Sequence, residues 1–213
     1  MPLPRHQLPP APPGARIGLF GGSFDPAHQG HLALSRAALR ALRLDRVWWL
    51  VSPGNPLKTN GPAPLAARLE RAAALTAGDP RLVVTALESR LGTRYTADTL
   101  AALRLHLARA HPVWVMGADS MAALHRWHAW DTIMQSVPVA VLARPGATLS
   151  ALTSVAARRY AAHRLPARQA ATLATSAPPR WCFLPMPMVD VSSTGLRARG
   201  VSAAEQSRTV AKT

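Results

Sequence analysis

Paired glycines and two histidines lie close together in GLFGGSFDPAHQGH, residues 18–31. Gly21 and Gly22 follow a short apolar run, and without Cβ atoms their backbone can approach a ligand closely. His28 and His31 are three residues apart, so both lie on one face if a helix begins here. The N-terminus of a helix offers free N–H groups and a partial positive charge to an anion. The segment therefore indicates a phosphate-binding turn between a strand and a helix.

The spacing of this segment leaves two alternatives open. A glycine-rich turn can simply connect a strand to a helix, and the segment matches neither the G-x-G-x-x-G pattern nor a Walker loop, because G-K-[ST] is absent. A histidine metal site is the second alternative, but no cysteine or carboxylate cluster completes it. Ser23 adds a hydroxyl group and a backbone donor, which suit phosphate. Phosphate binding and a plain connection therefore both stay open for this segment taken alone, and we expect no metal bound by the protein alone.

A second segment, VSSTGLR at residues 191–197, again places hydroxyl groups and a glycine before the start of a helix. Ser192, Ser193 and Thr194 can cap that helix and also bind phosphate oxygens. Arg197 stands three residues after Thr194, so its planar guanidinium can reach the same anion with two donors. An ordinary capped helix is the alternative for this segment taken alone.

The elements that must position these residues follow from the apolar patterning. Short β-rich runs alternate with stretches of helical periodicity, and this alternation predicts an α/β fold with a parallel sheet. We expect strands at 15–21, 46–52, 81–88, 112–119, 137–146 and 180–187, and helices at 30–43, 64–78 and 96–110. Residues 150–165 are a further helix candidate, and 167–179 are expected to be a loose connection. In such sheets ligands bind beyond the carboxyl ends of the strands, near the point where strand order reverses.

The length and composition predict one domain. The 213 residues are 48% hydrophobic, which suffices for one sizeable core. We expect a proline-rich flexible tail at 1–14, a single domain at 15–200 and a polar tail at 201–213. The tail at 1–14 lacks the apolar core of a secretory signal, and no run reaches the roughly 20 apolar residues of a membrane span. With Cys182 as the single cysteine, a reducing, cytoplasmic location is the expectation.

The chain is strongly basic, with a net charge of +15 and an isoelectric point near 11.8. Such a charge favours polyanions, which include nucleic acid, an anionic membrane and phosphorylated small molecules. The arginines are scattered among alanines and form neither a block nor a stripe with interleaved aromatic residues. We therefore expect no membrane and no nucleic-acid partner, although a basic nucleic-acid-binding protein stays a distant alternative.

The two phosphate-binding segments together resemble the nucleotidylyltransferase superfamily. GGSFDPAHQGH at 21–31 is similar to its G-[ST]-F-D-P-x-H-x-G-H segment, and VSSTGLR at 191–197 to its I-S-S-T-x-x-R segment, with Val191 in place of Ile. Four further segments are similar to those of bacterial nicotinate-nucleotide adenylyltransferases: VSPGNPLK (51–58), TRYTADTL (93–100), VMGADSMAALHRWHAWDTI (115–133) and ARPG (143–146). The resemblance covers roughly residues 16–200, and the chain departs from the family pattern beyond residue 200.

This resemblance implies a Rossmann-like, doubly wound parallel sheet and a reaction. ATP and nicotinate mononucleotide would give nicotinate adenine dinucleotide and pyrophosphate, with Mg²⁺ arriving with ATP. The phosphate nucleophile is already ionised, so positioning and electrostatics are needed rather than a general base. The resemblance gives the catalytic role to His28, His31 and Arg197, whose donors would hold the ATP phosphates. A different acceptor, nicotinamide mononucleotide or phosphopantetheine, is the alternative.

The resemblance also distributes the binding residues between the two substrates. ATP would contact Gly21, Gly22, Ser23, Phe24, Lys58, Ser192, Ser193 and Thr194. The acceptor would contact Tyr95, Thr96, Gly117, Asp119 and Trp127. Within this set, Thr96 would meet the nicotinate carboxylate at a helix start and Trp127 would stack on the pyridine ring. The choice between nicotinate and nicotinamide, the oligomeric state and any closure of loops on the ligand stay open.

Overall fold

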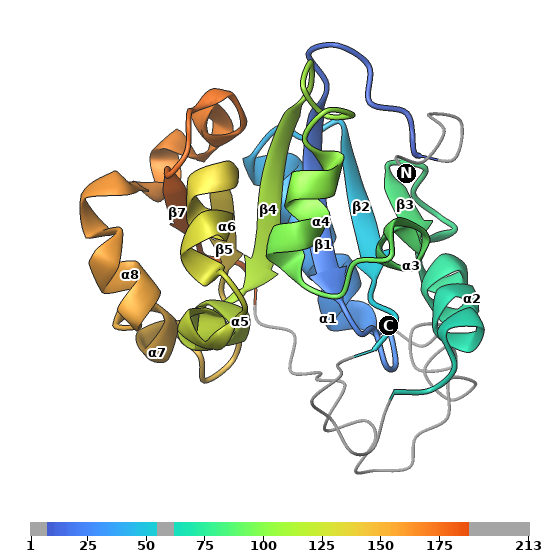
Figure 1. Cartoon of the computed structure of the whole chain (residues 1–213). Helices are drawn as coiled ribbons and strands as arrows, with labels where there is room; N and C mark the ends of the chain where they lie inside the picture. The colour runs from blue at the N-terminus through green and yellow to red at the C-terminus, as the bar shows by residue number, and fades with distance from the viewer. Residues whose placement is uncertain (1–7, 55–61, 188–213) are drawn as a thin grey trace.

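A seven-stranded parallel sheet organises the chain (Figure 1). The computed structural model describes residues 8–54 and 62–187. The strands are β1 (Arg16–Gly22), β2 (Arg46–Val51), β3 (Leu82–Thr85), β4 (His111–Gly117), β5 (Val139–Leu142), β6 (Arg164–Leu165) and β7 (Trp181–Leu184). Their order across the sheet is β3-β2-β1-β4-β5-β7-β6, and every neighbouring pair is parallel. The expected α/β fold with a doubly wound parallel sheet is confirmed.

The strand order reverses between β1 and β4. From β1 the chain moves outward through β2 to β3, then returns to pair β4 with the other side of β1. The carboxyl ends of β1 and β4 therefore border the crevice where ligands bind in sheets of this type. The histidine segment follows β1, and Gly117 ends β4, so the topology brings two of the sequence-predicted segments to this one place.

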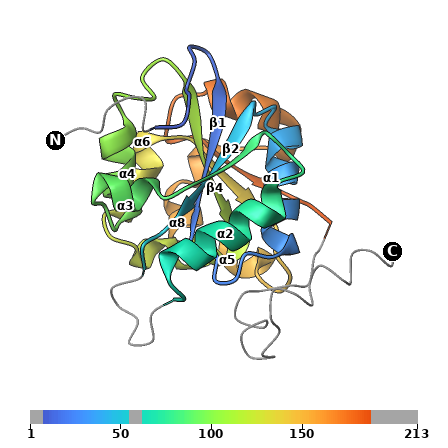
Figure 2. The same cartoon turned by 90° about the vertical axis from the view of Figure 1, so that its right-hand side faces the viewer.

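Helices cover both faces of the sheet, and Figure 2 shows α3, α4 and α6 on one side of the strands and α1 on the other. The first face carries α3 (Leu87–Leu91), α4 (Thr96–Leu103), α5 (Ala118–Ala123), α6 (Trp130–Ser136), α7 (Thr148–Leu152) and α8 (Val155–Arg159). The second face carries α1 (Gln29–Ala41), α2 (Leu65–Thr76) and the 3₁₀ segment η4 (Ala167–Thr175). Two shorter 3₁₀ turns are η2 (Leu124–Arg126) and η3 (Ala161–His163).

The central strands are buried on both faces, which explains their continuous apolar runs. In β2, Trp48 packs into the core beneath α3 and α4, whereas the next residue, Trp49, packs into the core beneath α1. Both side chains are completely buried. Successive side chains of a strand point to opposite faces, so one strand contributes a tryptophan to each core.

The structure differs from the sequence-based boundaries in the less regular parts. The helix expected at 96–110 ends at Leu103, and the candidate at 150–165 is divided into α7, α8, η3 and the two-residue strand β6. The connection at 167–179 was expected to be loose, but most of it forms η4, whose Leu173 is fully buried against the sheet. Alanine-rich sequence gives a weak apolar pattern, so tertiary packing decides these elements.

Residues 8–14 lie against the domain although they belong to the segment expected to be a flexible tail. Leu8 and Ala11 pack against the core of the first face, and the Gly14 N–H donates to the Arg109 carbonyl at 2.7 Å. His106 Nε2 lies 3.0 Å from the Pro9 carbonyl oxygen. Within the described residues no helix is both long and apolar enough to cross a membrane.

Candidate functional site

Gly21 and Gly22 carry the chain from β1 into the crevice. A Cβ atom on Gly21 would lie 2.6 Å from the indole of Trp114, which β4 places against this position. A Cβ on Gly22 would lie 3.4 Å from the ring of Phe24. Gly21 is therefore required by the close approach of Trp114, which is a packing reason for a residue that the sequence predicted to line a phosphate site.

Phe24 supports the turn from beneath. Its backbone has a φ of 47°, a left-handed conformation that is uncommon for a residue with a side chain. The ring is 1% exposed and stacks on Trp49 with centroids 4.7 Å apart and an interplanar angle of 11°. Its edge-to-face neighbours are Phe20 and His31. The Phe24 side chain is thus packed behind the histidines, while Ser23 beside it is exposed.

His28 and His31 cap the N-terminus of α1 together. His28 is the N-cap residue, and its Nδ1 accepts the N–H of Gly30 at 3.1 Å. His31 Nδ1 accepts the N–H of His28 at 3.3 Å, which completes a capping box built from two imidazoles. The two ring centroids are 3.8 Å apart. The predicted pairing of these histidines at the start of a helix is therefore present in the structure.

These caps fix the protonation of both rings. A neutral imidazole whose Nδ1 accepts a hydrogen bond carries its proton on Nε2, so both rings have Nε2–H available as a donor. His28 is 1% exposed, and its Nε2 has no hydrogen-bond partner among the described residues. A buried donor without a partner is costly unless a ligand satisfies it. The histidine segment therefore contains a buried donor, the Nε2–H of His28, that a bound ligand could satisfy.

The electrostatic surroundings keep both rings neutral. Burial, together with a smaller effect of the positive charge of Arg144, lowers the pKa of His28 to about 4. Burial also lowers the pKa of His31 well below its ordinary value, with smaller effects from His28 and Arg144. At neutral pH each ring is thus a neutral donor, and an incoming phosphate would meet N–H groups rather than imidazolium ions.

Arg144 is a candidate site residue to which the sequence argument assigned no role. It follows β5, and its Nε lies 3.8 Å from Asp119 Oδ1. A Cβ on Gly117 would lie 3.0 Å from Arg144 Nε and would also collide with the Asp119 carboxylate, so the glycine leaves room for this pair. The signal in the sequence was ARPG at 143–146, which directly follows a strand that ends at the crevice.

The two segments expected to bind the acceptor meet each other. The Tyr95 and His128 rings have centroids 4.6 Å apart at an angle of 36°, and Tyr95 is 40% exposed. Tyr95 is the N-cap residue of α4 and Thr96 is its first residue, as expected for a helix start. Trp127 is half-buried and packs against the core of the first face. His128 is a second residue that the sequence argument missed, and only its place beside Trp127 marked it.

Several predicted site residues fall outside the described residues. These are Lys58, Ser192, Ser193, Thr194 and Arg197. The predicted site residues that the structure describes lie in three groups: the β1 turn with its two histidines, the Gly117–Asp119–Arg144 cluster after β4 and β5, and the aromatic segments around Tyr95 and Trp127.

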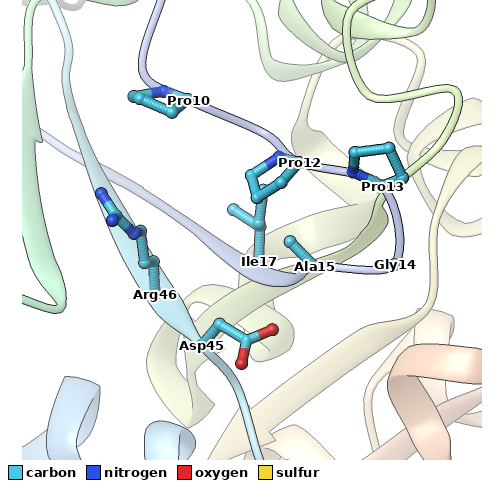
Figure 3. A pocket seen from close by; sticks show the side chains of 8 residues that line it. All are labelled: Pro10, Pro12, Pro13, Gly14, Ala15, Ile17, Asp45 and Arg46. Carbon is cyan, nitrogen blue, oxygen red and sulfur yellow. The ribbon is translucent and has the colours of Figure 1, made fainter.

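A separate hollow lies at the opposite end of the central strands (Figure 3). It is lined by Pro10, Pro12, Pro13, Gly14, Ala15, Ile17, Asp45 and Arg46. Ala15 and Ile17 lie at the beginning of β1, and Arg46 begins β2, so the hollow borders the amino ends of the strands. Asp45 is engaged by the Arg16 N–H at 2.7 Å. Since the histidines lie beyond the carboxyl end of β1, this hollow is distinct from the candidate site.

Comparisons with known proteins give consistent results for sequence and fold. Residues 19–199 match the family model described as cytidylyltransferase-like. A relative from Ruegeria pomeroyi, named probable nicotinate-nucleotide adenylyltransferase, is 56% identical over 205 residues, which are 96% of each chain. A relative of the same name from Cereibacter sphaeroides is 58% identical over 184 residues, covering 86% of this chain and 97% of the relative. Plasmodium falciparum nicotinic acid mononucleotide adenylyltransferase complexed with NaAD has a similar fold, with a TM-score of 0.68 at 13% identity, covering 91% of this chain and 89% of the other.

Proposed function

The chain belongs to the cytidylyltransferase-like family and, within it, to the nicotinate-nucleotide adenylyltransferases; from this we propose that it transfers the adenylyl group of ATP to nicotinate mononucleotide and releases pyrophosphate. Such a reaction is a step of NAD biosynthesis. The structural observation that carries the proposal is the buried Nε2–H of His28, which has no partner among the described residues, beside a second neutral ring.

The site suits a reaction between two anions. The attacking phosphate oxygen is ionised at neutral pH, so no general base is needed. The difficulty is to bring it to the α-phosphate of ATP and to stabilise the negative charge that develops on the leaving pyrophosphate. We propose that His28 and His31 donate their Nε2–H groups to ATP phosphate oxygens at the start of α1, where the helix dipole also favours negative charge.

Arginines would supply the positive charge that the neutral histidines lack. The positive charge of Arg144 lowers the pKa of both rings, so it would also attract an anion held by the histidines. We propose that Arg144 attracts a phosphate of one substrate and that Asp119 orients its guanidinium. Arg197, with the hydroxyl groups of Ser192, Ser193 and Thr194, keeps its expected role at the leaving pyrophosphate, and Lys58 at a phosphate.

The acceptor would occupy the aromatic side of the crevice. Tyr95 and His128 bring the start of α4 beside the segment that follows α5, so Thr96 and Trp127 belong to neighbouring segments. We propose that Trp127 stacks on the pyridine ring and that the N-terminus of α4 receives the nicotinate carboxylate. Gly117 and Asp119 would then lie toward the ribose.

Mg²⁺ is proposed as a companion of ATP. Among residues 8–54 and 62–187, no three histidine, cysteine, aspartate or glutamate side chains gather closely enough to hold a metal ion. Triphosphate oxygens and water can complete an octahedral Mg²⁺ shell without a protein cage. The ion would neutralise phosphate charge, while the protein's part is to hold the phosphates with N–H donors.

The function is tested by pyrophosphate release with ATP and Mg²⁺, offering nicotinate mononucleotide, nicotinamide mononucleotide and phosphopantetheine in parallel. We expect turnover to be fastest with nicotinate mononucleotide and to be lost in His31→Ala. Faster turnover with phosphopantetheine would assign the chain to a different transferase. Absence of turnover with all three acceptors would reject the proposed reaction.

A further inference from the structure

A buried arginine, Arg68, joins the turns that border the candidate site. It is not one of the residues proposed to bind phosphate. Arg68 lies in the first turn of α2, and its side chain is fully buried. Only Arg68, His28, Asp79 and Glu88 are buried side chains of ionisable type, cysteine and tyrosine aside, among the described residues. A buried guanidinium is costly unless its donors are satisfied, so its partners indicate what it does.

The partners of Arg68 are backbone carbonyls from three segments. Nη1 donates to the carbonyls of Ser23 and Ser52, both at 2.7 Å. Nη2 donates to the Pro53 carbonyl at 3.1 Å, and Nε donates to the Ala63 carbonyl at 2.7 Å. Four of the five guanidinium N–H groups are thus used, and each is used on the backbone.

These carbonyls belong to the turns after β1 and β2 and to Ala63, which precedes the N-cap residue of α2. The Ser52 N–H also donates to the Gly22 carbonyl at 3.0 Å, so the two strand ends are joined directly as well as through Arg68. The Ser23 carbonyl lies in the same turn as Phe24 and leads to His28. The guanidinium therefore fixes the turn that presents the histidines relative to the neighbouring strand.

Asp25 balances the buried charge at longer range. Its carboxylate accepts the Ala63 N–H at 3.4 Å, and Ala63 is also a partner of Arg68. Burial lowers the pKa of Arg68, while the negative charge of Asp25 raises it. An arginine stays protonated under such a shift, so the cation is permanent.

We propose that Arg68 is a positioning residue for adenylyl transfer: it holds the β1 turn at the setting in which the two histidines meet the ATP phosphates. This inference rests on the proposed function for its kinetic consequence, but its structural part stands on the four hydrogen bonds alone. It predicts that substitution of Arg68 lowers kcat/KM for ATP by more than the accompanying loss of stability would explain. A small displacement of reacting groups is enough for that, since about 1 Å can cost roughly 10²-fold in rate.

The fork of donors explains why arginine is needed. Lysine has a single ammonium on a flexible stem and cannot reach four carbonyls arranged around a planar group. Arg68→Lys keeps the positive charge and loses the fork, whereas Arg68→Met keeps an extended side chain and loses every donor. Both variants are therefore expected to loosen the β1 turn, with Lys the milder of the two.

The matched control is Leu42→Ala. Leu42 is fully buried at the opposite end of α1 and belongs to the same core as Phe24. Its truncation is expected to lower the melting temperature through a cavity and to leave the turns after β1 and β2 unchanged. Comparison with Arg68→Lys thus separates loss of stability from loss of positioning.

Two readouts test the proposal in the whole chain. In steady-state kinetics, kcat/KM for ATP is expected to fall roughly 10- to 100-fold in Arg68→Lys, with a smaller change in KM for nicotinate mononucleotide, and to stay within about twofold in Leu42→Ala. In hydrogen exchange, the amides of residues 22–28 and 51–54, apart from Pro26 and Pro53, which have none, are expected to exchange faster in Arg68→Lys and Arg68→Met, while β4 stays protected.

The two readouts fail separately. If wild-type protein shows no adenylyl transfer, the proposed function is rejected, and hydrogen exchange alone still decides whether Arg68 holds the turns. Unchanged exchange at residues 22–28 and 51–54 in folded Arg68→Met would overturn the inference. So would an equal loss of kcat/KM in Leu42→Ala and Arg68→Lys at comparable melting temperatures, because the effect would then be one of stability only.

Discussion

Replacement of His28 by asparagine separates the two roles that the structure gives to this residue. His28 caps α1 through Nδ1 and presents Nε2–H to the proposed phosphate. Asparagine is among the best N-cap residues, so its side-chain oxygen can accept the Gly30 N–H in place of Nδ1. Its shorter side chain has no counterpart of Nε2. His28→Asn therefore keeps the cap and removes the donor, whereas His28→Ala removes both.

The magnitudes follow from these roles. Loss of one donor to a group that gains charge in the transition state costs about 3–4 kcal/mol, or roughly 10²–10³ in kcat. Loss of an N-cap costs about 1 kcal/mol in stability. For a domain of this size, that cost lowers the melting temperature by roughly 2–4 °C. We expect both variants to lose activity to a similar extent and only His28→Ala to lose stability.

The assay is pyrophosphate release at saturating ATP and nicotinate mononucleotide, combined with thermal unfolding of each variant. If kcat of His28→Asn stays within about threefold of the wild-type value, the donor role of Nε2 is refuted. A similar drop in melting temperature for both variants would refute the capping argument, since asparagine should replace the cap.

Three further predictions concern packing and charge. Gly21→Ala forces a methyl group to within 2.6 Å of Trp114, and should destabilise the protein by about 1–3 kcal/mol in denaturant unfolding; no change would mean that Trp114 moves freely. In Arg144→Ala the pKa of His28, followed by NMR, should rise because a nearby positive charge is removed, yet stay below its ordinary value because burial is the larger cause; a fall would contradict this. Burial raises the pKa of Glu88 to about 7. The stabilising contribution of the protonated carboxyl is therefore complete below the pKa of the unfolded chain, decreases by about 3 kcal/mol as pH rises from there to 7, and is lost above 7. Glu88→Gln should unfold with a flatter pH profile, and parallel profiles of the two proteins would contradict the shift.

The sequence predicted the sheet well because its signals are local. The run RVWWLV needs burial on both faces, and a parallel strand provides it. The pairing of His28 with His31 was equally predictable from the sequence, since residues three apart at a helix start lie on one face. The secondary structure of residues 147–180 was harder to predict, because an alanine-rich sequence fits a helix, a 3₁₀ turn or a loop equally well. Tertiary contacts, such as those that bury Leu173, decide among them.

The roles of individual arginines could not be predicted from the sequence. Arg68 and Arg71 both lie in the same alanine-rich helix, yet Arg68 is fully buried and Arg71 is exposed. What distinguishes them is the position of carbonyls on turns more than ten residues away in the chain, which no local pattern encodes. The role of Arg144 could not be predicted for the same reason, since it depends on Asp119 and His28, which follow other strands of the sheet.

The central claim is that both histidines are neutral Nε2–H donors to phosphate, and ¹⁵N NMR of the imidazole nitrogens tests it most directly. We expect the Nε2–H tautomer for His28 and His31 at neutral pH, with both Nε2 signals shifting when a non-hydrolysable ATP analogue is added. The signals of His106, whose ring binds the Pro9 carbonyl at the other end of the domain, should not move. An Nδ1–H tautomer in either ring, or Nε2 signals that ignore the analogue, would contradict the account.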